Sequence, residues 1–186
     1  MAELTKIMLA GEGGQGVQSV AQILAEAADN EGKEALYIPN FGVEQRGGVS
    51  IAYLQISNER IGAPKFNIGD IVVAVSERAI LRTKQYVGEN TIFIYDSSVD
   101  IAEEELPQNA AKILAIPALD IAKNELHPRV FNIIILGVIV AATKVVSQED
   151  AKKAIEKKLG YKFEQNPKLR ELNFKAIDRG AELVSQ

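Results

Sequence analysis

A glycine-rich turn near the N-terminus has the spacing of an anion-binding site. Residues 11–16 read GEGGQG, which fits the pattern G-x-G-x-x-G between a short apolar run and a segment of helical periodicity. Glycines let the backbone approach a ligand closely, and the free N–H groups at a helix start favour negative charge. The candidate binding residues in this turn are Gly11, Gly13, Gly14, Gln15 and Gly16.

The same turn lacks a feature that dinucleotide binding requires. Such a site needs an acidic residue about 20 positions further on, at the end of the second strand, to bind the ribose. The second expected strand, residues 35–38, is followed by Pro39, Asn40 and Phe41, with no carboxylate. Three interpretations stay open here: a variant NAD site, a purely structural tight turn, and a turn that contacts another phosphate-bearing ligand or a partner subunit.

A second loop, residues 41–48, reads FGVEQRGG and combines three glycines with one carboxylate and one guanidinium. Arg46 can hold a carboxylate or phosphate through two parallel N–H bonds, which a lysine cannot do. Glu44 and Arg46 can equally pair with each other, and an exposed pair contributes little stability. Because both loops follow strands, we expect them at one carboxyl edge of the sheet, where ligands bind. The candidate residues of this loop are Glu44, Arg46, Gly47 and Gly48.

The elements that carry these loops alternate between strand and helix patterns. The expected strands cover residues 7–10, 35–38, 49–56, 71–75, 91–95 and 111–116, and the expected helices cover residues 17–28, 76–86, 118–126, 148–159 and 168–183. This alternation predicts an α/β fold: a mainly parallel sheet flanked by helices, a Rossmann-like three-layer sandwich in one domain over residues 1–186. Ser147 is the expected N-cap of the helix that follows it. The apolar run 130–142 is too short for a membrane span, which takes about 20 residues, and we expect it to be buried.

The amino-acid composition excludes several kinds of functional site. The 186 residues include 21 Lys and Arg, 25 Asp and Glu, no cysteine and one histidine, His127. Without cysteine the chain forms no disulfide, thiolate nucleophile or iron–sulfur ligand, and the mild acidity argues against nucleic acid as a partner. We expect His127 at a surface or helix end, and Asp96 either at a ligand or in a cap. We therefore expect no catalytic residue and no metal site on this chain, no membrane insertion and, because no signal segment is visible, a cytoplasmic location.

The two glycine-rich segments together resemble the gamma subunit family of 2-oxoacid:ferredoxin (acceptor) oxidoreductases. The likeness covers most of the chain, in the same order and spacing. It continues through residues 56–57, 61–64, Asp70, Asn132, 136–137 and 148–151. The resemblance implies a small α/β subunit of a larger enzyme, which converts a 2-oxoacid, CoA and an oxidised acceptor into acyl-CoA, CO2 and the reduced acceptor.

The resemblance also implies how cofactors and partners are distributed. In that family, thiamine diphosphate and its Mg²⁺ are held by the alpha and beta subunits, and the iron–sulfur clusters lie on beta and a ferredoxin-like delta subunit. This chain would then hold no cofactor and would be inactive in isolation. It would pack against the thiamine-binding subunits, contribute to the CoA side of the site, and pass electrons to ferredoxin or a similar acceptor only through the complex.

The sequences of residues 43–48 and 61–64 resemble those of 2-oxoglutarate enzymes most. Pyruvate enzymes often carry a different small residue after the Arg-Gly pair, whereas indolepyruvate enzymes share the QRGG core of residues 45–48. Asp120 departs from the threonine expected in its stretch. Two alternatives remain beside the subunit: a stand-alone nucleotide-binding oxidoreductase, and a structural module that binds nothing small.

Overall fold

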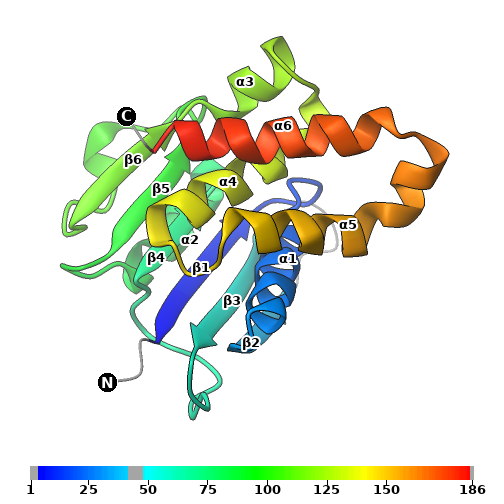
Figure 1. The fold of residues 1–186 in the computed structure, drawn as a ribbon. Coiled ribbons are helices and arrows are strands. Elements are labelled where there is room, and N and C mark those ends of the chain that lie inside the picture. The colour runs from blue at the N-terminus through cyan, green and yellow to red at the C-terminus, as the bar shows by residue number, and fades with distance from the viewer. Residues whose placement is uncertain (1–3, 42–47, 185–186) are drawn as a thin grey trace.

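Six strands form one mixed sheet in the computed structural model, which describes residues 4–41 and 48–184 (Figure 1). The strands are β1 (Thr5–Gly11), β2 (Glu34–Asn40), β3 (Ser50–Ser57), β4 (Ile71–Ala74), β5 (Ile92–Asp96) and β6 (Lys112–Ile116). Their order in the sheet is β2-β3-β1-β4-β5-β6. The pairs β1–β4, β4–β5 and β5–β6 are parallel, so the predicted α/β fold with a mainly parallel sheet is confirmed.

Strand β3 departs from the parallel arrangement. It runs antiparallel to both neighbours and separates β1 from β2. β1 and β2 still point the same way, so both carboxyl ends lie at one edge of the sheet, together with the start of β3. All residues of β3 after Ser50 are buried, so the apolar pattern of this strand gave no indication of its direction.

The helices cover the two faces of the sheet unequally. They are α1 (Val17–Asn30), α2 (Glu77–Thr83), α3 (Ala118–Asn124), α4 (Phe131–Thr143), α5 (Gln148–Gln165) and α6 (Lys168–Glu182), with short 3-10 helices η1 (Lys84–Tyr86), η2 (Glu103–Glu105) and η3 (Pro128–Val130). Side chains of α1 and α4 share a core with Leu9 and Val73, whereas α2 packs with Met8 and Val72 on the opposite face. The sheet is flanked by helices as predicted, but α5 and α6 add an outer layer over α1 and α4.

The helix boundaries follow local capping. The side chain of Ser147 accepts a hydrogen bond from the N–H of Asp150 at 3.0 Å, which confirms it as the N-cap of α5. Ser76 accepts from Ala79 at 3.2 Å in the same way and begins α2. Helix α5 continues to Gln165, past the expected end at residue 159, because its last turns are mostly polar and carry little periodic signal.

The apolar run 130–142 forms α4, and the expectation that it is buried is confirmed. In α4, nine residues between Phe131 and Val140 are buried. Such a helix needs apolar cover on every side. None of the helices within the described ranges is long and apolar enough to cross a membrane.

Helix α6 packs against α4 so closely that backbone atoms of the two helices are in contact. A Cβ added at Gly180 would lie 3.1 Å from the Cα of Gly137 and well inside contact distance of the Ile134 carbonyl oxygen. A Cβ at Gly137 would collide in the same way with the carbonyl oxygen of Ile177. Both glycines are therefore required by the close crossing of the two helices.

We expect Gly180→Ala to destabilise the chain by about 1–3 kcal/mol, because backbone atoms cannot move aside as flexible side chains can. Gly160→Ala is the matched control, since Gly160 lies in α5 with open space where its Cβ would be. That control should be neutral or stabilising by about 1 kcal/mol, the helix preference of alanine over glycine. Urea unfolding of both variants measures the difference. A Gly180→Ala protein as stable as the native chain would contradict this packing.

Candidate functional site

The glycine-rich turn is open at the carboxyl edge of the sheet. Gly14 and Gly16 have φ of 90° and 77°, values in the left-handed region that favours glycine. Gly13 and Gly14 are exposed, and no atom lies within 4 Å of a Cβ added at either. A ligand or a partner chain can therefore approach the backbone of these two residues closely.

The Gln15 side chain fixes the shape of the turn from within. Its Oε1 accepts a hydrogen bond from the Glu12 N–H at 2.6 Å, and its Nε2 donates to the Val75 carbonyl at 2.9 Å. A Cβ at Gly11 would lie 2.7 Å from Val75 Cγ2 and 2.9 Å from Gln15 Oε1. Because this amide is engaged within the chain, the groups of the turn that remain open are the backbone of Gly13 and Gly14.

The start of α4 closes on the other end of the turn. A Cβ added at Gly16 would lie 2.7 Å from Nδ2 of Asn132, in the first turn of α4. Gly16 is therefore required twice, by its left-handed φ and by this contact. The structure thus brings together two positions, Gly16 and Asn132, that lie far apart in the sequence.

The second loop leaves the sheet beside the first. Glu44, Arg46 and Gly47 lie outside the described residues, and Gly48 is partly buried. The strand register pairs Gly11 with Ser50, so the end of the second loop adjoins the first turn. The expectation that both loops emerge at one edge is confirmed for their described ends.

Sequence reasoning missed Gln18, which ties the bases of the two loops together. Its Nε2 donates to Ser50 Oγ at 2.6 Å and to the Ile51 carbonyl at 3.1 Å. Its Oε1 accepts from the Tyr37 hydroxyl at 2.6 Å, and burial raises the pKa of Tyr37. The only signal in the sequence was a polar residue in the first turn of an apolar helix, which is also common on exposed faces.

We expect Gln18→Leu to destabilise the chain by about 1–3 kcal/mol, because it leaves partly buried polar groups on β2 and β3 without this partner. Tyr37→Phe is the matched control, since it removes one hydroxyl and leaves the bonds to Ser50 and Ile51 intact. Guanidinium unfolding of both variants gives the comparison. If both variants lower the free energy of unfolding by the same amount, Gln18 does not hold the strands together.

Two polar residues considered in the sequence serve local structure. Asp96 is 1% exposed and accepts hydrogen bonds from the N–H groups of Ser98 at 3.0 Å and Leu119 at 2.9 Å, which confirms the cap interpretation. His127 is exposed, and its Nδ1 accepts from the Arg129 N–H at 3.1 Å, which confirms its place at a helix end. Across residues 4–41 and 48–184, no three His, Asp or Glu side chains are grouped so that they could hold a metal ion.

Comparison with known proteins tests the resemblance seen in the sequence. Residues 6–183 match the family described as pyruvate ferredoxin/flavodoxin oxidoreductase. The chain belongs to this family. It is 33% identical to the 2-oxoglutarate synthase subunit KorC of Methanocaldococcus jannaschii, over 97% of this chain and 94% of that protein. It is 32% identical to the ketoisovalerate oxidoreductase subunit VorA of Methanothermobacter thermautotrophicus, over 95% of this chain.

Two solved structures of the family share the fold. The gamma subunit of a keto/oxoacid ferredoxin oxidoreductase from Geobacter sulfurreducens superimposes with a TM-score of 0.81 at 32% identity, covering 97% of this chain and 98% of that one. The 2-oxoglutarate:ferredoxin oxidoreductase from Magnetococcus marinus, with 2-oxoglutarate, coenzyme A and succinyl-CoA bound, gives a TM-score of 0.89 at 25% identity over 98% of this chain. The resemblance to oxidoreductase gamma subunits is thereby confirmed.

The relatives differ in length and in substrate name. This chain spans 36% of the length of VorA and 31% of the Magnetococcus marinus chain, so in both proteins the matching segment is part of a longer polypeptide. The relatives are named for ketoisovalerate and for 2-oxoglutarate. Membership in the family therefore leaves the choice of 2-oxoacid open.

Proposed function

We propose that this chain is the gamma subunit of a 2-oxoacid:ferredoxin oxidoreductase that converts 2-oxoglutarate, CoA and an oxidised acceptor into succinyl-CoA, CO2 and the reduced acceptor. Family membership supports the subunit type, and the likeness of residues 43–48 and 61–64 to 2-oxoglutarate enzymes supports the substrate. Thiamine diphosphate, Mg²⁺ and the iron–sulfur clusters belong to alpha, beta and delta partner subunits in this proposal. The chain itself contains no cysteine to ligate a cluster.

The observation that carries the proposal is the open backbone of Gly13 and Gly14 beside the base of the second loop. Peptide N–H groups at the start of a helix favour an anion, and α1 begins directly after this turn. Arg46, in the second loop, would add a guanidinium for a CoA phosphate or a partner carboxylate. This chain's part in the reaction is then to bind and orient, next to chemistry performed on partner chains.

An exposed aromatic side chain supports a partner surface at the same edge. Phe41 directly follows β2 and is 68% exposed. Aromatic residues are enriched in protein interfaces, where they lose contact with water. The proposal therefore places the thiamine-binding subunits against Phe41 and the open turn.

The first test is purification of the tagged chain from its own cells under native conditions. We expect larger chains that carry thiamine diphosphate and iron–sulfur clusters to co-purify, with CoA-dependent reduction of ferredoxin by 2-oxoglutarate. Activity with pyruvate or ketoisovalerate instead would keep the subunit and change the substrate. A lone chain that carries a bound nucleotide would contradict the proposal and favour a stand-alone nucleotide-binding oxidoreductase.

We expect Gly13→Leu to lower the CoA-dependent rate of the complex about tenfold or more, a loss of about 1.4 kcal/mol in transition-state stabilisation. The free chain should keep its stability, because Gly13 is exposed and a Cβ added there meets no atom within 4 Å. Gly62→Leu is the matched control: it is also exposed and open, but lies after β3 at the opposite edge. Steady-state kinetics and thermal unfolding measure both effects. A native rate and native CoA dependence in Gly13→Leu would exclude close approach at this turn.

A further inference from the structure

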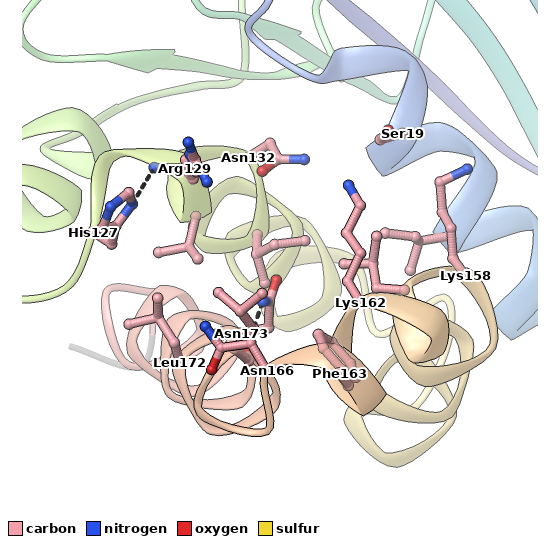
Figure 2. Close-up of a pocket in the computed structure, with 15 residues that line it drawn as sticks. Ser19, His127, Arg129, Asn132, Lys158, Lys162, Phe163, Asn166, Leu172 and Asn173 are labelled. Atoms are coloured by element: carbon pink, nitrogen blue, oxygen red, sulfur yellow. Dashed lines mark hydrogen bonds between the residues drawn. The ribbon is translucent and has the colours of Figure 1, made fainter.

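A cavity of about 450 Å³ lies on the face of the sheet that α1 and α4 cover. It is enclosed by α1, the segment that leads into α4, the second half of α5 and the start of α6 (Figure 2). Its volume falls within the range of about 300–1,000 Å³ found for small-molecule sites. Its lining residues are Ser19, Ile23, His127, Arg129, Val130, Asn132, Ile133, Lys158, Leu159, Lys162, Phe163, Asn166, Leu169, Leu172 and Asn173.

The inner part of the cavity is apolar. Ile23, Val130 and Ile133 are 1–2% exposed, and Phe163 is 7% exposed. Leu159, Leu169 and Leu172 pack against this same core. An aliphatic or aromatic body placed here would be removed from water, which is favourable in proportion to the apolar area buried.

The rim of the cavity is cationic. Figure 2 shows Arg129 and His127 on one side and Lys158 and Lys162 on the other. Aspartate and glutamate are absent from the lining residues. Because Nδ1 of His127 accepts a hydrogen bond, the neutral ring carries its proton on Nε2 and can act as a further donor.

The cavity-lining cations differ from the other lysines of α5. Lys153 pairs with Glu149 and Lys157 pairs with Glu26. Lys158 instead donates to the neutral amide of Gln22, and the described residues include no carboxylate in an ion pair with Lys158 or Lys162. Lys158 and Lys162 therefore lie beside an apolar cavity and form no ion pair with a described carboxylate.

We propose that this cavity binds a small amphipathic anion, with one carboxylate or phosphate group at the rim beside Lys162 and an aliphatic body on the apolar floor. Arginine and lysine both bind these head groups, and the apolar floor selects a ligand with a hydrocarbon chain over a free inorganic ion. This inference is argued from the cavity alone and does not depend on the proposed function.

The cavity also touches the glycine-rich turn through one residue. Asn132 lines the cavity and packs against the position of a Cβ at Gly16. A bound ligand would therefore contact the side chain that closes the turn. The backbone amide of Gly16 gives a nearby reporter of binding that does not require enzyme activity.

The test is an NMR titration of the full isolated chain with octanoate, octyl phosphate, octanamide and inorganic phosphate. We expect saturable shifts of the Asn132 and Gly16 amides with octanoate or octyl phosphate, and the tighter of the two identifies the preferred head group. Octanamide and inorganic phosphate should each bind at least about tenfold more weakly, equivalent to about 1.4 kcal/mol. Binding of octanamide as tight as that of both anions, or no saturable binding of either anion, would overturn the proposal.

Variants locate the site. Lys162→Glu should weaken binding of the preferred anion about tenfold, or about 1.4 kcal/mol, and Leu172→Trp should weaken it by filling the cavity without a change of charge. Lys112→Glu is the matched control, since it makes the same charge change at an exposed position on β6. Equal weakening by Lys112→Glu and Lys162→Glu would show that only net charge matters and would overturn the proposal. So would native affinity in Leu172→Trp.

Discussion

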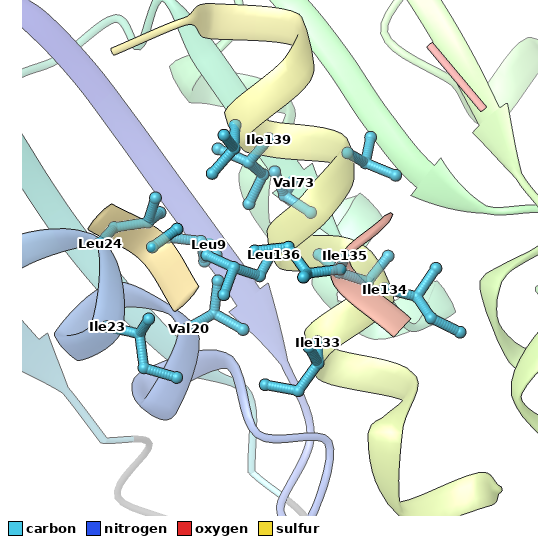
Figure 3. Packing of buried hydrophobic residues seen from close by; sticks show 14 of the residues in the cluster. Leu9, Val20, Ile23, Leu24, Val73, Ile133, Ile134, Ile135, Leu136 and Ile139 are labelled. Carbon is cyan, nitrogen blue, oxygen red and sulfur yellow. The ribbon is translucent and has the colours of Figure 1, made fainter. Parts of the chain in front are cut away.

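Helices α4 and α6 cross with their backbones in contact at Gly137 and Gly180, and the position of α4 follows from this crossing. Figure 3 shows side chains from Ile133 to Ile139 on α4, with Leu9 and Val73 from the sheet and Val20 from α1. A helix that is apolar all round is stable in water only when neighbours cover every side. The glycine pair lets α6 provide that cover.

The same placement of α4 reaches the candidate site. With α4 fixed between the sheet and α6, its first turn brings Asn132 against Gly16, where the glycine-rich turn becomes helix α1. Inside the turn, the Gln15 side chain accepts a hydrogen bond from the Glu12 N–H and donates one to the Val75 carbonyl. These contacts within the chain hold the turn in the shape that leaves the backbone of Gly13 and Gly14 open.

Much of the fold could be predicted, because the spacing of apolar residues within one segment is enough to indicate a helix or a strand. Every expected strand and helix is present, and the described ends of both loops lie at the predicted edge. The antiparallel direction of β3 could not be predicted, because a strand buried on both faces reads the same way in either direction. The Gln18 bridge and the cavity were missed because their members are brought together only by tertiary packing; the cavity alone draws on residues from Ser19 to Asn173. The family came from the resemblance of two motifs, which composition and periodicity alone would not have supplied.

The measurement that most directly tests the central claim is hydrogen–deuterium exchange of the amides from Gly13 to Val17, in the free chain and in the complex with its partner subunits. We expect slower exchange in the complex, and slower still when CoA is added, while the amides around Gly62 at the opposite edge exchange equally in both. Equal exchange of the turn in the free chain and in the complex would contradict the claim that this surface faces a ligand or a partner.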